Sequence, residues 1–175
     1  MATSLVSELD RLVNALGEDG AKDVSLPALA EKIAKELRVN ADEVAILGVS
    51  YKWKHLHFLV PVGLKNVGFV PLTSNSALVA KTARENKAEI HNNFPAMRHA
   101  TVFEGVKAPT TSGESIQKII SAPIVYDGKV VGVLQVSRKG ANLTSAGADF
   151  TAEDLIKVQG ICRPLGKLVA ELAGE

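Results

Sequence analysis

Two segments near the start of the chain have the apolar spacing of amphipathic helices. Leucines four, three and four residues apart predict a first helix, which carries Leu5, Leu9, Leu12 and Leu16 on one face. Residues 17–20 contain two glycines, which favour the end of a helix. Ser25 suits the N-cap of a second helix, and Pro27 suits its first turn, where no backbone donor is needed. Apolar residues four apart then predict that this helix runs to about Arg38.

The pattern changes to that of β-strands from residue 44. Residues 44–49 and 56–62 are rich in branched and aromatic side chains and predict two strands. Residues 61–71 contain too many prolines and glycines for a central strand, so we expect a loop there. Ser74 is expected to cap a short helix that ends at about residue 85.

The second half of the chain predicts a covering loop followed by a hairpin. A brief strand is expected over residues 88–91, and residues 92–113 have no clean period, which favours a long covering loop. Residues 116–126 and 129–138 are apolar strands. The Asp127-Gly128 pair between them supplies the two positive φ angles of a type I′ turn, so these strands should form a β-hairpin.

The chain ends in a long predicted helix with two apolar faces. Thr151 is its expected N-cap, with Asp154 three residues later, and Pro164 is expected to kink it. One face can cover the sheet, and the other can meet the first helix or a second subunit. We therefore expect residues 1–20 to form a dimer arm, residues 21–175 to form the domain, and the terminal helices to build a homodimer.

The composition of the chain narrows the range of partners and cellular compartments that we expect. The 20 basic and 19 acidic side chains give a net charge of +1, which provides no long-range attraction to nucleic acid or anionic lipid. No apolar run is long enough for a membrane span, and the first ten residues lack a signal-peptide pattern. A single cysteine, Cys162, cannot form an internal disulfide. These features predict a cytoplasmic protein with neither nucleic acid nor membrane as a partner.

Three segments together resemble the GAF domain family. They are SALVAKTARENKAEI (76–90), SAPIVYDGKVVGVLQVSRK (121–139) and FTAEDL (150–155), in the order that this family uses. The resemblance covers about residues 25–172 and implies an α+β fold, an α/β/α sandwich. Its centre would be an antiparallel sheet of five or six strands, with the terminal helices on one face and a small-molecule pocket under loops on the other. GAF domains usually sense and rarely catalyse, so the resemblance implies that the protein is not an enzyme.

The cyclic-nucleotide-binding members of this family have a motif that is only partly present here. Lys139, Phe150 and Asp154 match the motif, whereas Arg138 and Leu155 depart from it. The departures argue against cyclic-nucleotide binding. We expect Lys139 and Asp154 to tie two segments together across the loop rather than to contact a ligand.

Other chemistries of the family can be compared with the residues present. Members that reduce methionine sulfoxide need several thiols, and one cysteine cannot form and resolve a disulfide. Members that attach a bilin use a cysteine in the pocket region, whereas Cys162 lies in the terminal helix. Haem binding stays open through His91 or His99, because one axial imidazole suffices. The cofactor is otherwise unassigned, and the alternative is that the protein has none.

The candidate ligand site lies in the covering segment, which combines polar groups with apolar walls as ligand pockets do. Arg98 would hold a carboxylate or phosphate, and Asn92 and His99 would orient the ligand. The full set of candidate binding residues is Asn92, Phe94, Met97, Arg98, His99 and Thr101. The alternative is a lid packed on its own sheet, with Arg98 in water.

The remaining chemically active residues carry weaker signals. His55 and His57 alternate along a strand and leave the same face beside Trp53, but they lack the third ligand that a metal site needs, so no metal is assigned. Cys162 lies on an apolar helical stripe, where a thiol behaves as a small hydrophobe. No Gly-x-Ser-x-Gly motif or phosphate-binding loop occurs, so no catalytic residue is assigned.

These observations predict a GAF-like sensory or regulatory domain that binds a small molecule of unknown identity and acts as a homodimer in signal transduction. Any signal would pass in trans to a signalling protein through the helices. The alternative is a protein interaction or dimerisation module without a ligand, distinguished by whether Asn92, Arg98 and His99 face a cavity or water.

Overall fold

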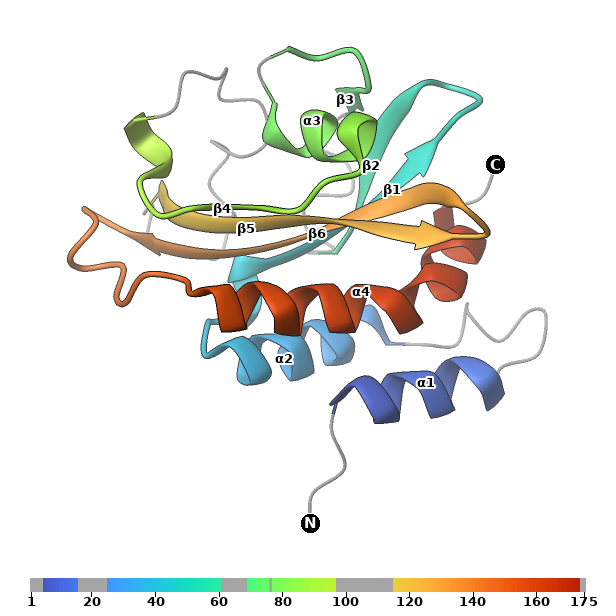
Figure 1. The fold of residues 1–175 in the computed structure, drawn as a ribbon, viewed down its shortest axis with the longest axis horizontal. Helices are drawn as coiled ribbons and strands as arrows, with labels where there is room; N and C mark the ends of the chain where they lie inside the picture. The colour runs from blue at the N-terminus through green and yellow to red at the C-terminus, as the bar shows by residue number, and fades with distance from the viewer. Residues whose placement is uncertain (1–4, 16–24, 61–68, 76, 97–114, 174–175) are drawn as a thin grey trace.

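The computed structural model describes residues 5–15, 25–60, 69–75, 77–96 and 115–173 of the chain (Figure 1). The described strands form one six-stranded antiparallel sheet in the order β3-β2-β1-β6-β5-β4, which confirms the predicted fold class. The strands are β1 (Val44–Ser50), β2 (His55–Val60), β3 (Val70–Pro71), β4 (Glu89–His91), β5 (Ser115–Tyr126) and β6 (Lys129–Gly140).

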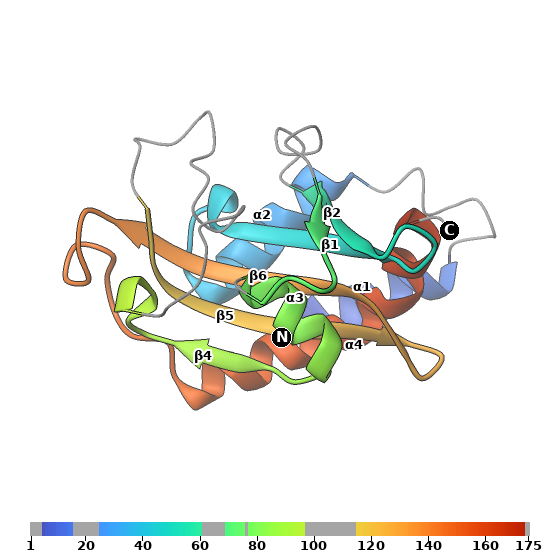
Figure 2. The ribbon, with the colours of Figure 1, turned by 90° about the horizontal axis from the view of Figure 1, so that it is seen from above.

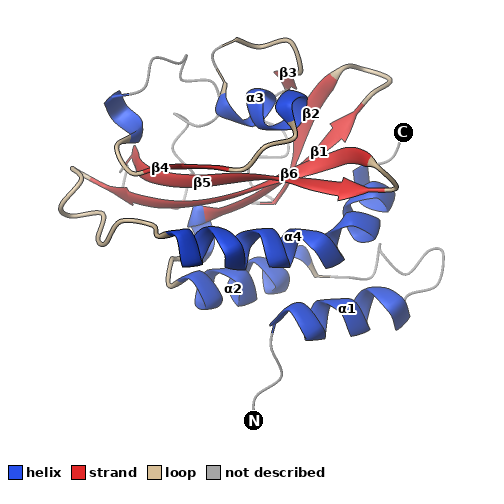
Figure 3. Ribbon diagram, in the orientation of Figure 1, coloured by secondary structure: helices blue, strands red, loops and turns tan. Residues whose placement is uncertain are grey.

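Helices cover both faces of this sheet. The larger layer lies on one face and consists of α1 (Leu5–Ala15), α2 (Leu26–Leu37) and α4 (Ala152–Ala173), as Figures 1 and 3 show. The opposite face carries α3 (Leu78–Glu85). Along the chain, α3 is followed by β4 and the short 3₁₀ helix η4 (Phe94–Ala96). Seen from above, α3 lies over β5 and β6 (Figure 2). We call these faces the helix-layer face and the α3 face.

The helix ends follow the capping residues that the sequence predicts. Ser25 Oγ accepts a hydrogen bond from the backbone of Ala28, and Arg38 closes α2 in the left-handed region at φ 59°. Thr151 Oγ1 accepts from the backbone of Asp154 at 3.2 Å, while Asp154 Oδ2 accepts from the backbone of Thr151 at 2.8 Å. This reciprocal pair is a capping box, and it fixes the start of α4.

The hairpin turn between β5 and β6 is also as predicted. Asp127 and Gly128 have φ angles of 53° and 74°, the two positive values that a type I′ turn needs. The two strands pair along their whole length, from Ser115 with Gly140 to Tyr126 with Lys129. The turn therefore sets the register of the pairs next to it, and the register shifts between Ile124 and Val125 and again between Ile116 and Lys118.

Alternation along these strands sends side chains into a separate core on each side of the sheet. Ile120 and Leu134 belong to the core under α1, α2 and α4, whereas Val133 points to the α3 face. One face of α4 packs on the sheet and another packs on α1, where Leu5 and Leu9 are buried. The second apolar face of α4 thus meets the first helix, which is one of the two partners that the sequence analysis expected for it.

Two predicted boundaries were wrong. Val70 and Pro71, placed in a loop, form β3 against His55 and Leu56, because a two-residue edge strand tolerates a proline that a central strand does not. The helix α3 begins at Leu78 rather than directly after Ser74. Ser74 still caps the turn before it, with Oγ accepting from the backbone of Ala77 at 3.1 Å.

Within the described residues, no helix is long and apolar enough to cross a membrane.

Candidate functional site

The predicted binding residues divide between described and undescribed parts of the chain. Asn92 and Phe94 lie at the end of β4 and in η4. Met97, Arg98, His99 and Thr101 lie outside the described residues. The structure therefore places two of the six candidates. Phe94 packs on the α3 face with Leu78 and Ile119, whereas the Asn92 amide bonds to Phe150, whose ring belongs to the core under α1, α2 and α4.

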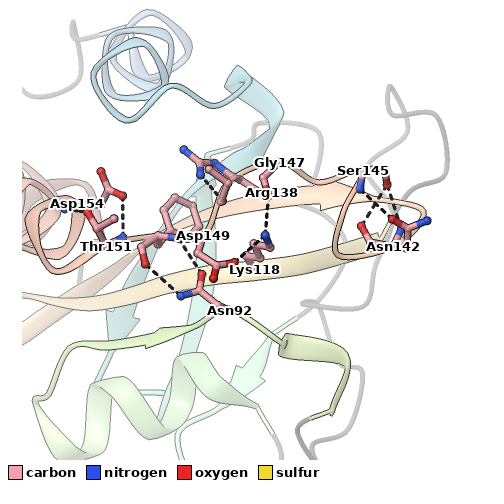
Figure 4. Close-up of polar contacts among 11 residues, drawn as sticks. Asn92, Lys118, Arg138, Asn142, Ser145, Gly147, Asp149, Thr151 and Asp154 are labelled. Carbon is pink, nitrogen blue, oxygen red and sulfur yellow. Dashed lines mark hydrogen bonds and ion pairs between the residues drawn. The ribbon is translucent and has the colours of Figure 1, made fainter.

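Asn92 connects the end of β4 to the entrance of α4 (Figure 4). Its Oδ1 accepts from the backbone N–H of Phe150 at 2.8 Å, and its Nδ2 donates to the carbonyl of Phe150 at 3.1 Å. The Phe150 ring is buried and lies under the guanidinium of Arg138, whose central carbon is 4.5 Å from the ring centroid. The amide of Asn92 thus pairs with backbone much as one strand residue pairs with another.

We expect Asn92→Ala to lower the free energy of unfolding by about 1–3 kcal/mol, because two hydrogen bonds are lost and two backbone groups are left without them. Urea unfolding followed by circular dichroism measures this change. Asn93→Ala is the matched control, since Asn93 is exposed, and should change stability by less than about 0.5 kcal/mol. Equal effects of the two variants would contradict the assigned role of Asn92.

A group of buried polar residues lies on the α3 face, and we call it the polar floor: Thr82, Gln117, Ser121, Gln135 and Ser137. Gln135 Nε2 donates to Ser121 Oγ at 3.0 Å, and Ser121 Oγ lies 2.7 Å from Thr82 Oγ1. Thr82 Oγ1 donates its only hydroxyl hydrogen to the carbonyl of Leu78 at 3.0 Å, so Ser121 must be the donor to Thr82. The result is a directed chain of hydrogen bonds from β6 through β5 into α3.

Gln117 and Ser137 continue the polar floor along the same strands. Gln117 Nε2 donates to the carbonyl of Gly140 at 2.9 Å, and Ser137 Oγ donates to the carbonyl of Glu43 at 3.3 Å. Sequence reasoning missed this group. The available signal was the even spacing of polar residues in strands that are mainly apolar, four residues apart at 117 and 121 and two apart at 135 and 137.

A carboxylate extends the polar floor to the edge of the sheet. Glu89 of β4 lies opposite Ser121 in the strand register. Its Oε1 is 3.3 Å from Lys81 Nζ and 3.2 Å from His91 Nε2. Its Oε2 is buried and has no hydrogen-bond partner within the described part of the chain. A buried carboxylate oxygen is normally satisfied, so this atom is suited to accept a hydrogen bond from a ligand.

The contact with Glu89 bears on the open question of haem. His91 Nε2 lies beside the Glu89 carboxylate, so Nδ1 is the ring nitrogen that this contact leaves for a haem iron. His99 lies outside the described residues. Among the described residues, no group of three or more histidine, cysteine, aspartate or glutamate side chains is arranged to hold a metal ion.

The predicted tie between Lys139 and Asp154 was wrong, and a different lysine holds the loop before α4. Lys139 Nζ donates to the carbonyl of Asp42 at 3.1 Å, and Asp154 caps its own helix.

Lys118, buried on β5, instead holds this loop: its Nζ lies 2.8 Å from Asp149 Oδ1 and donates to the carbonyl of Gly147 at 2.5 Å (Figure 4). Asx-type hydrogen bonds between Asn142 and Ser145 shape the start of the same loop. Strand register decides which lysine pairs with an aspartate of this loop, and the sequence motif carries no information on register.

Cys162 is buried in α4, and this burial raises the pKa of its thiol to about 12. Unfolding at a pH between about 9 and 12 therefore releases a proton, so this thiol lowers stability as the pH rises through that window. We expect the stability advantage of the wild type over Cys162→Ala to shrink by about 1.4 kcal/mol between pH 7 and pH 10. Urea titrations at the two pH values measure it, and a constant difference would contradict the burial of the thiol.

The comparisons with known proteins agree with this geometry. The GAF domain family model matches residues 25–167. No curated protein matches the chain. Among solved structures, the GAF domain of an Acinetobacter phosphoenolpyruvate-protein phosphotransferase is similar at a TM-score of 0.65 and 18% identity, covering 94% of this chain and 90% of that one.

Two further structures show the same fold. Residues 122 to 287 of a methyl-accepting chemotaxis protein match at a TM-score of 0.66 and 16% identity, covering 97% of this chain and 96% of that one. Free methionine-R-sulfoxide reductase from Neisseria meningitidis, in complex with its substrate, matches at 0.63 and 14%, covering 99% and 96%. With the family model matching most of its length, the chain belongs to the GAF domain family.

Proposed function

We propose that this GAF domain is a sensory or regulatory module that binds a small polar molecule over the polar floor, on the α3 face. The observation that carries the proposal is Glu89 Oε2, a buried acceptor with no partner in the described chain, beside the hydrogen-bonded chain of Ser121 and Gln135. The similar chemotaxis protein supports a signalling context, and the reductase structure supports small-molecule binding by this fold. The single cysteine supports a reducing, cytoplasmic compartment.

The charges around Glu89 indicate the ligand class. A ligand hydroxyl, amide or ammonium group would donate to Oε2, while Lys81 and His91 already share Oε1. The ligand would then reach the hydroxyl and amide groups of the floor with its other polar atoms. A polar metabolite with at least one hydrogen-bond donor fits this arrangement.

The first experiment is mass spectrometry of the purified full chain under native and denaturing conditions, with a visible absorption spectrum of the same sample. A small molecule that is released on denaturation would support the proposal, and a Soret band would identify it as haem. A polar-metabolite panel in thermal-shift assays extends the search to weak ligands. The absence of a bound mass, together with the absence of any ligand-induced shift, would overturn the proposal.

A variant pair links any ligand to this site. Glu89→Gln retains the size of the side chain and removes its charge, so we expect affinity for the identified ligand to fall about tenfold or more. Glu36→Gln is the matched control on the exposed surface of α2 and should leave affinity unchanged. Equal affinities of both variants and the wild type would place the ligand elsewhere.

We further propose that the module binds without catalysis. Cys162 is the only cysteine of the chain, and its pKa of about 12 keeps it protonated and unreactive at neutral pH. The purified protein should therefore not reduce free methionine-R-sulfoxide in the presence of dithiothreitol. Measurable turnover would overturn this part of the proposal.

An interaction module without a ligand is the second candidate. Apolar side chains fill part of the α3 face, where Phe94 packs with Leu78 and Ile119. In either case we propose a homodimer formed through the terminal helices, acting on a signalling protein in trans. Light scattering at micromolar concentration tests the dimer, and a monomer would contradict it.

A further inference from the structure

A second concave site lies on the helix-layer face, away from the polar floor. It is a hollow of about 710 Å³ beside the β1–β2 turn, and we call it the hairpin hollow. Ala173, the last residue of α4, forms one wall, and Trp53 and Phe69 form others. Figures 1 and 2 both show the C-terminal end of α4 beside the β1–β2 turn. The volume lies within the range of about 300–1,000 Å³ that is usual for small-molecule sites.

Strand alternation and a short turn build this hollow. His55 and His57 are two residues apart on β2, so both side chains leave the same face, as the sequence predicts. Ser50 Oγ accepts from the backbone of Trp53 at 3.2 Å, which holds the turn that carries the indole. Phe69, just before β3, stacks on the His55 ring with centroids 4.1 Å apart and planes 7° apart.

The aromatic groups of the hollow are unusually accessible. The Trp53 side chain is 67% exposed and that of Phe69 is 63% exposed. Large apolar rings that stay open to water next to a cavity are typical of binding sites. Planar rings at the wall favour a flat, aromatic ligand, because ring stacking adds to burial of apolar area.

The polar lining carries one sign of charge. Lys52 Nζ lies 5.3 Å from the centroid of the Trp53 ring, and both imidazoles face the same space. No carboxylate belongs to the described lining. An anionic group would therefore meet the ammonium group of Lys52 without repulsion from a carboxylate of the described lining.

We propose that the hairpin hollow binds a planar aromatic anion, an aromatic ring that bears a carboxylate or a phosphate. The ring would lie against Trp53 and the stacked Phe69–His55 pair, and the anionic group would lie near Lys52. Such a ligand would contact Ala173 and so occupy the end of α4, on the opposite face of the sheet from the polar floor. The site is independent of the function proposed above.

The single tryptophan of the chain makes the site directly observable, because its indole N–H gives one resonance in a ¹H–¹⁵N spectrum. Three probes are titrated into the ¹⁵N-labelled full chain: 1-naphthoate, the neutral 1-naphthalenemethanol and the non-aromatic cyclohexanecarboxylate. We expect a saturable shift of the Trp53 indole with naphthoate at a Kd below about 1 mM, and at least about tenfold weaker binding of the other two. Equal binding of the neutral probe would overturn the charge argument, and no indole shift would overturn the site.

Single substitutions test which residues of the hairpin hollow contact the naphthoate probe. Lys52→Ala and Phe69→Ala should each weaken naphthoate binding about five- to tenfold, since one removes the charge and the other removes a stacking wall. Lys32→Ala on the exposed surface of α2 and Gln135→Ala on the polar floor should leave naphthoate binding unchanged. A spectrum of each variant that retains the wild-type pattern shows that the fold is intact. Unchanged affinity in both hollow variants, or an equal loss in Gln135→Ala, would overturn the proposal.

Discussion

Gly166→Ala should lower the free energy of unfolding by about 1–3 kcal/mol, because an added methyl group has no room between α4 and the sheet. A Cβ at this position would overlap the carbonyl oxygen of Val125 and lie 3.3 Å from the Cβ of Tyr126. Both neighbours are backbone or backbone-proximal atoms of β5, so neither can rotate away. The C-terminal half of α4 would have to move off the sheet.

The same helix offers a matched control. A Cβ added at Gly160 would meet only Val6 Cγ2 at 3.6 Å, which is ordinary van der Waals contact. Gly160→Ala should therefore raise stability by about 0.5–1 kcal/mol, the usual gain in a helix interior. Thermal unfolding measures both variants, with a shift of about 2–4 °C expected per kcal/mol at this chain length. A loss of stability in Gly160→Ala would contradict the open space beside Gly160, and no loss in Gly166→Ala would contradict the close approach of α4 to β5.

Elements specified by neighbouring residues could be predicted from the sequence. The type I′ turn depends on Asp127 and Gly128 alone, and the capping box depends on Thr151 and Asp154, so each was recognisable from a few letters. The apolar spacing of the terminal helix correctly indicated two packed faces. Together with the family resemblance, these local signals were sufficient for the fold.

Features that depend on distant partners could not be predicted. Strand β3 exists because Val70 and Pro71 meet the edge of β2, and no local pattern within residues 69–75 indicates this pairing. Lys118 rather than Lys139 holds the loop before α4, since strand register decides which lysine lies beside Asp149. A motif names residue types, whereas the ion pair depends on their positions in space.

The candidate site shows the same division. Of the two described candidates, Phe94 packs on the α3 face, whereas the side-chain amide of Asn92 is used in hydrogen bonds to the backbone of Phe150. The polar floor was missed because even spacing shows only which polar residues share a face within one strand, Gln117 with Ser121 and Gln135 with Ser137. Only the paired register of β5 and β6 shows that they are neighbours.

Phe94→Ala should be among the most destabilising single substitutions on the α3 face, with an expected loss of about 3–5 kcal/mol. The ring is buried, with 3% of its surface exposed, and packs with Leu78 of α3 and Ile119 of β5. It therefore fastens the segment after β4 to both the helix and the sheet. Removing the ring would leave a cavity where these three elements meet, and urea unfolding followed by circular dichroism measures the loss.

Two further variants distinguish a packing residue from a ligand wall at this position. Phe94→Leu retains most of the apolar volume and should cost less than about 1.5 kcal/mol. Phe69→Ala makes the same truncation at a ring that is 63% exposed, so it should cost less than about 1 kcal/mol. If Phe94→Ala were as mild as Phe69→Ala, the Phe94 ring would not be a packing element. Its place on the α3 face would then favour the wall of an open ligand cavity, and the interaction module without a ligand would lose the observation that supports it.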